Sequence, residues 1–131
     1  MLKQLERAIE EQNEKQLQSY FIDFFYQTKE IDKIFYPIIA RVLSEKWHDQ
    51  QEDIIALIWL KNLKDNKFID PIMKIAQQRE IFRPFDDEFE STLRKCVHAL
   101  KTIGTEESNL AIEKLLETGN ENVNYALENY K

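Results

Sequence analysis

Apolar residues recur at three- and four-residue spacing along most of this 131-residue chain, which is the spacing of one helix face. Lys, Glu, Gln, Leu and Ile dominate and only two Gly and three Pro interrupt them, so the composition also favours helix. Pro37 predicts a kink or a helix restart, since Pro lacks an N–H and clashes with the preceding turn. The pattern predicts helices over residues 2–12, 14–27, 31–43, 49–63, a fifth ending near 79, 87–103, 105–118 and 120–130.

Both glycines follow an apolar stripe and precede a residue that can cap a helix. Gly104 is followed by Thr105 and Gly119 by Asn120. Glycine readily adopts the left-handed conformation that ends helices, and Thr or Asn accepts a hydrogen bond from the first free N–H groups of the next. Each pair therefore predicts one helix end and the next helix start.

The fourth predicted helix has its own start signal. Asp49 followed by Glu52 fits a capping box, and the residues after them are apolar on more than one face. This helix is therefore expected to lie buried between neighbours, with Trp59 in the core. The fifth helix starts either at Asp65 or at Asp70, and the pattern leaves both open.

The chain repeats itself with a shift of 40 residues, which places Leu60 on Leu100 and Lys74 on Lys114. Two antiparallel helices in a unit of about 40 residues are typical of HEAT or armadillo-like repeats, which stack because one unit cannot bury its own apolar stripe. The expected fold is all-α: a single domain over 1–131, forming an α-solenoid of about three helical hairpins with terminal capping helices. The units are 14–43, 49–79 and 87–118, with 2–12 and 120–130 as caps.

Two stretches support this interpretation by resemblance. "LRKCVHALKTIGTEESNLAIEKLLETG", residues 93–119, resembles a HEAT repeat, and "WHDQQEDI", residues 47–54, is similar to the Trp-His and Glu-Asp pairing of small bacterial HEAT-repeat proteins. In that group a second His tends to precede the Glu-Asp pair, whereas Gln51 stands here. The likeness covers roughly residues 46–130. Proteins of this kind include immunity proteins that neutralise a toxin, so the resemblance implies protein binding.

Charge and cysteine content narrow the possible functions. The net charge is −6, and residues 86–131 hold five basic and ten acidic groups, giving −5. No basic cluster of the kind that binds nucleic acid is evident, whereas an acidic end would attract a basic partner, such as a nuclease toxin. Ordinary solvated glutamates explain the same charges. One cysteine, a charged N-terminus and short apolar runs predict a cytoplasmic protein without membrane spans.

Two residue pairs carry side chains that are capable of catalysis or metal binding. Cys96 and His98 are two residues apart, so on a helix they point about 200° away from each other, and Cys96 falls on the apolar stripe. His48 and Glu52 could give two metal ligands on one face, but a metal site needs more ligands than two histidines supply. We therefore expect a non-enzymatic protein without cofactor or metal. The alternatives are a metal-dependent enzyme or chromophore lyase on the same scaffold, and nucleic-acid binding by the concave face.

The best interaction candidates lie where predicted helices connect. Residues 79–88 combine aromatic and guanidinium groups of the kind enriched in binding hot spots, and Trp47 stands at a junction between units. Both could instead be packed against neighbouring helices. We expect one protein partner and a monomer or weak dimer. The candidate protein-binding residues are Trp47, His48, Arg79, Phe82, Arg83, Phe85, Asp86 and Asp87.

Overall fold

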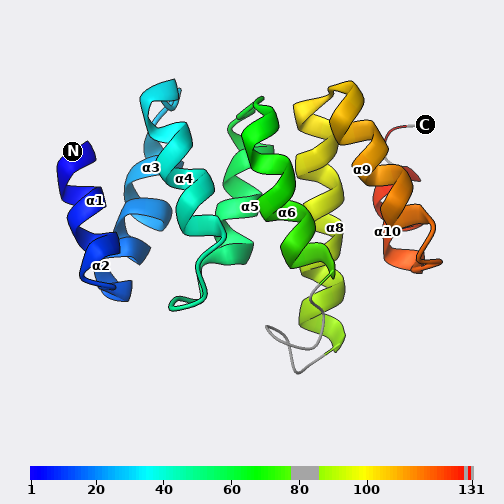
Figure 1. The fold of residues 1–131 in the computed structure, drawn as a ribbon, viewed down its shortest axis with the longest axis horizontal. Helices are drawn as coiled ribbons and strands as arrows, with labels where there is room; N and C mark the ends of the chain where they lie inside the picture. The colour runs from blue at the N-terminus through cyan, green and yellow to red at the C-terminus, as the bar shows by residue number, and fades with distance from the viewer. Residues whose placement is uncertain (78–85, 129, 131) are drawn as a thin grey trace.

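The computed structural model describes residues 1–77, 86–128 and 130, with the backbone alone described for 86–91. This part of the chain is all-helical and holds no strand, and its helices follow one another from the N-terminus to the C-terminus along the longest axis (Figure 1). The α-helices are α1 Leu2–Glu10, α2 Glu14–Gln18, α3 Phe25–Gln27, α4 Tyr36–Leu43, α5 Gln51–Leu60, α6 Ile69–Gln77, α8 Asp86–Ile103, α9 Glu106–Leu116 and α10 Glu121–Glu128.

The contacts between the helices define two rows. Helix α8 packs against α5 on one side and α10 on the other, while α6 packs between α4 and α9. The rows are joined where α4 meets α5, α6 meets α8, and α8 meets α9. Among the described residues, every helix is too short or too polar to span a membrane.

Three stretches differ in detail from the simple periodic pattern. Residues 14–27 are helical throughout, as predicted, but their middle turn, Ser19–Phe24, is a π-helix. The restart predicted at Pro37 is confirmed: a 3₁₀ turn over Lys33–Phe35 leads into α4, with the proline in its first turn. Of the two proposed starts of the fifth helix, Asp65 caps a 3₁₀ turn over Asn66–Phe68, whereas Asp70 lies inside α6, which begins at Ile69.

The capping box predicted at Asp49 is wrong. Helix α5 begins at Gln51, after an N-cap residue, Gln50, whose side chain makes no capping hydrogen bond. The preceding turn is organised instead by His48, whose Nδ1 accepts the Gln50 N–H at 2.9 Å. The Asp49 N–H donates to Glu14 Oε1 at 3.0 Å, so this residue ties the loop to α2.

Both glycine stop signals are confirmed. Gly104 and Gly119 have φ of 68° and 75°, the left-handed region that ends a helix. Thr105 caps α9 in a capping box with Ser108, and Asn120 Oδ1 accepts the N–H of Asn122 at 2.9 Å at the start of α10.

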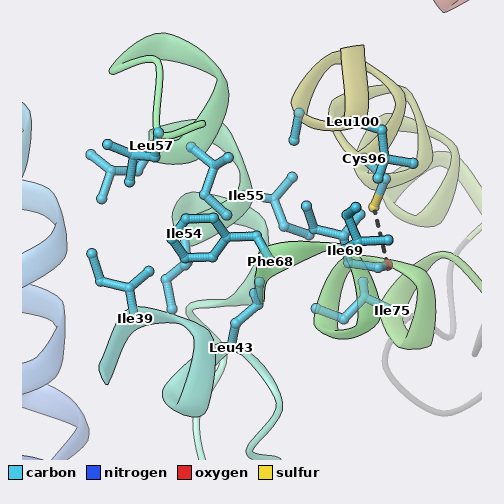
Figure 2. Packing of buried hydrophobic residues seen from close by; sticks show 14 of the residues in the cluster. Ile39, Leu43, Ile54, Ile55, Leu57, Phe68, Ile69, Ile75, Cys96 and Leu100 are labelled. Atoms are coloured by element: carbon cyan, nitrogen blue, oxygen red, sulfur yellow. Dashed lines mark hydrogen bonds between the residues drawn. The ribbon is translucent and has the colours of Figure 1, made fainter. Parts of the chain in front are cut away.

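One apolar cluster runs through the described helices and joins both rows. Figure 2 shows side chains from α4, α5, α6 and α8 meeting in it. Phe68 is fully buried and packs its ring 5.4 Å from that of Tyr36. Trp59, however, is only half-buried, so the prediction that it lies in the core is wrong.

Replacing Phe68 by Ala should lower the free energy of unfolding by about 3–5 kcal/mol, because the buried ring leaves a cavity that its neighbours fill only in part. Urea denaturation checks the value. Ile34→Ala is the control: this side chain is 58% exposed, and its loss should stay within about 0.5 kcal/mol. Equal losses in the two variants would contradict this description of the core.

Candidate protein-binding surface

The connection singled out in the sequence lies mostly beyond what the structure describes. Asp86 and Asp87 form the start of α8, where the backbone alone is described. Four residues lie outside the described residues altogether: Arg79, Phe82, Arg83 and Phe85.

Trp47 and His48 lie in the loop between α4 and α5. The imidazole of His48 is 2% exposed: its Nδ1 accepts the Gln50 N–H, so its Nε2–H donates to the Val42 carbonyl at 2.7 Å. Trp47 is half-buried, stands edge-on to His48 at 4.9 Å, and donates its Nε1–H to Glu45 Oε1 at 3.0 Å. The buried imidazole therefore offers a partner almost no surface, while the indole keeps one accessible part.

His48 and Glu52, the two residues considered as metal ligands, form hydrogen bonds with different partners. Glu52 Oε1 accepts a hydrogen bond from Lys95 Nζ at 2.8 Å, an ion pair that links α5 to α8. The ring nitrogens of His48 are both used within its loop. Within the described ranges no group of three His, Cys, Asp or Glu side chains could hold a metal ion.

Cys96 and His98 likewise face different surroundings. The thiol of Cys96 is fully buried, and burial together with the charge of Glu52 raises its pKa, so the nucleophilic thiolate is disfavoured. The thiol donates to the Ile72 carbonyl at 4.0 Å. His98 is instead partly accessible and contacts aromatic rings.

His98 lies between two aromatic side chains from distant parts of the chain. Its ring stacks on Trp59 of α5, with centroids 4.3 Å apart and planes at 17°. Its Nδ1 shares a hydrogen bond of 2.7 Å with the Tyr130 hydroxyl. Burial lowers the pKa of His98 and so favours the neutral form.

Two cations on the same helix cover tyrosine rings. The Arg94 guanidinium lies 5.5 Å from the Tyr125 ring centroid, and its Nε donates to Asn122 Oδ1 at 2.7 Å. Lys101 Nζ lies 5.6 Å from the ring centroid of Tyr130. Each contact of this kind contributes about 0.5–1 kcal/mol at exposed positions and limits the rotation of the ring.

These groups lie along one face of α8 and on the segments beside it, and together we call them the aromatic surface. Along α8, residues at positions i, i+4 and i+7 share one side, and α5 and α10 flank that helix. Tyr125 and Tyr130 are 57% and 44% exposed. The aromatic surface comprises Trp59, Arg94, His98, Lys101, Tyr125 and Tyr130.

The aromatic surface could not be recognised from local sequence. It joins α5, α8 and the C-terminal segment, and the sequence pattern placed Trp59 in the core. The sequence contains one pattern that points to this surface. Arg94, His98 and Lys101 lie on one helix face, opposite the apolar stripe that includes Cys96.

Exposed carboxylates surround the C-terminal end of the molecule. They are distributed along α9, α10 and the turn between them, and none is buried. They are Glu106, Glu107, Glu113, Glu117, Glu121 and Glu128.

No protein-family model, curated protein or solved structure matches this chain.

His98 should make folding stability depend on pH. Its pKa is lower in the folded chain than the ordinary 6.5, so the unfolded chain binds more protons as the pH falls. The stabilising effect is therefore complete above about pH 6.5 and is lost as the pH falls through the folded pKa.

Urea denaturation between about pH 7.5 and 5.5 measures this dependence. We expect the His98→Gln variant to lose less stability over that interval than the natural chain does, because Gln does not titrate. The difference between the two chains isolates the contribution of His98, because every other titratable group is common to both. Parallel pH curves for both chains would rule out this role of His98.

Proposed function

We propose that this chain is a HEAT-like α-solenoid that binds one protein partner through its aromatic surface. The observation that supports the proposal most strongly is the pair of exposed tyrosine rings, Tyr125 and Tyr130, held in place by Arg94, Lys101 and His98. Tyr, Trp and Arg are the residues that most often dominate binding energy at protein interfaces.

The fixed geometry of these rings is what favours binding. A side chain that is already ordered loses little rotamer entropy when a partner covers it, so more of the contact energy appears as affinity. Tyr130 has a hydrogen bond and a cation over its ring, and Tyr125 has a cation over its ring. These contacts therefore preorganise the tyrosine rings of the aromatic surface for binding.

The solenoid part of the proposal is supported by the two rows of helices and by the 40-residue repeat. In a solenoid each helical pair contacts mainly its neighbours along the chain, and one apolar interior continues through all of them. The contacts that α4, α5, α6, α8, α9 and α10 make with one another, and the apolar cluster they share, support this part of the proposal.

The proposed partner class is a toxin that this chain neutralises as an immunity protein. Two observations support it: the resemblance of residues 47–54 and 93–119 to small bacterial HEAT-repeat proteins, and the exposed carboxylates of α9 and α10. A field of negative charge accelerates the approach of a basic protein, such as a nuclease domain, and the aromatic surface then supplies short-range contacts.

Coexpression with the product of the neighbouring reading frame tests this function. We expect the two proteins to coelute as a complex and, where that product arrests growth alone, growth to be restored. Tyr125→Ala combined with Lys101→Ala should weaken the complex at least about tenfold, because the pair removes one exposed ring and one cation from the aromatic surface. Calorimetric titration of the purified proteins gives the affinity.

Ile34→Ala is the matched control, because it removes an equally exposed side chain far from α8. Its affinity should equal that of the natural chain. Failure of the two proteins to form any complex would refute the toxin assignment. A complex that tolerates the Tyr125 and Lys101 substitutions would show that another surface is used.

A further inference from the structure

A groove lies between α6 and α9, in the row of helices that does not carry the aromatic surface. Its volume is about 480 Å³. Ile69 and Ala111 are buried, Met73 is half-buried, and Leu110 is 52% exposed along one wall. The groove thus has an apolar lining that is open to solvent.

The two helices that form this groove are aligned by their N-terminal ends. Asn66, just before α6, donates its Nδ2–H to Glu107 Oε2 at 2.9 Å, and its Oδ1 accepts the Thr105 hydroxyl at 2.7 Å. Both α6 and α9 therefore begin at the same end of the groove and run in the same direction (Figure 1). These contacts fix the groove in the free protein.

Charge changes sign along the groove. Asp70 and Glu107 lie in the first turns of α6 and α9, whereas Lys74 follows one turn later and Lys114 two turns later. At a rise of 1.5 Å per residue, the carboxylate and ammonium positions of α9 are about 10 Å apart along the axis. All four side chains are exposed, so each can meet a partner of opposite charge.

We propose that this groove binds an amphipathic helix of a protein partner, running antiparallel to α6 and α9, with acidic residues in its first turn and basic residues in its last. In this orientation the acidic turn faces Lys74 and Lys114, and the basic turn faces Asp70 and Glu107. The same charge distribution also suits the dipole of the incoming helix, which favours acidic residues at its start and basic ones at its end.

The dimensions of the groove suit a helix of about three turns. Helix α6 has 9 residues and α9 has 11, which corresponds to about 14–17 Å of groove. A helix lying between two others buries an apolar stripe against both, and Met73 and Leu110 are placed to contact such a stripe. The carboxylates of Asp70 and Glu107 would repel a polyphosphate along the same path.

This inference shares with the proposed function only the premise that the chain binds proteins. The groove and the aromatic surface are made of different residues. The aromatic surface lies on α5, α8 and the C-terminal segment, and the groove is formed by α6 and α9. A partner could therefore occupy both surfaces at once, or two partners could bind independently.

A synthetic 14-residue helical peptide, capped at both ends, tests the inference with the full chain. It carries two Glu in the first turn, Leu at the i, i+3, i+4 and i+7 spacing, and two Arg in the last turn. Fluorescence anisotropy should show saturable binding. The double variant Lys74→Glu with Lys114→Glu should weaken peptide binding at least about tenfold, because it removes the charge match. Leu110→Ala should weaken peptide binding at least about fivefold, because it removes part of the apolar wall.

A matched charge change elsewhere provides the control. Lys3→Glu with Lys15→Glu alters net charge equally on exposed positions of α1 and α2, and should leave peptide affinity unchanged. A second peptide, with Lys in place of the two Glu, should bind the Lys74/Lys114 variant better than the first peptide does. Tyr125→Ala should not affect either peptide, which separates failure of this inference from failure of the proposed function.

Three results would overturn the proposal. The first is no saturable binding up to about 1 mM peptide. The second is equal weakening by the Lys3/Lys15 and Lys74/Lys114 variants, which would indicate a nonspecific charge effect. The third is a concentration-dependent dimer that Leu110→Ala abolishes and that excludes the peptide, which would assign the groove to a second copy of this chain.

Discussion

The rest of the structure depends on the burial of α5. Ile54, Ile55, Leu57 and Ile58 are completely buried although they point in different directions from the helix axis, so this helix must be covered on several sides at once. Burying each such side chain contributes about 1.5–3 kcal/mol, and a lone pair of helices could not provide the cover. The positions of α4, α8 and the π-helical turn around α5 meet this requirement.

Because the inner faces of the helices form the core, their outer faces are the ones that remain available for recognition. The row formed by α5, α8 and α10 presents rings and cations, whereas the row formed by α4, α6 and α9 presents an apolar groove with charges at both ends. Ile69 and Ala111 line the groove and also belong to the apolar cluster, whereas the exposed residues of both surfaces, such as Leu110, Lys114 and Tyr125, lie outside it. Substitutions on either surface can therefore change recognition while leaving most of the folding energy intact.

Local rules predicted the helical content, the two glycine stops and the burial of α5, because each depends on a few residues near in sequence. They failed where the outcome depends on a competing contact. His48, rather than Asp49, makes the hydrogen bond that organises the turn before α5. Trp59 lies at the border of the apolar cluster, half-buried, where it stacks on His98. The aromatic surface joins α5, α8 and the C-terminal segment, and only the packed helices bring these together. Hydrogen-bond shifts such as the π-helical turn leave no trace in apolar spacing.

The buried thiol of Cys96 gives the molecule a reporter of its own motions. It is the single cysteine of the chain, it lies where α8 meets α6, and its raised pKa suppresses the reactive thiolate. An alkylating reagent can reach this sulfur only while the two helices separate. The rate of alkylation therefore measures how often that interface opens, and a ligand that clamps the helices together would slow it without any label being introduced.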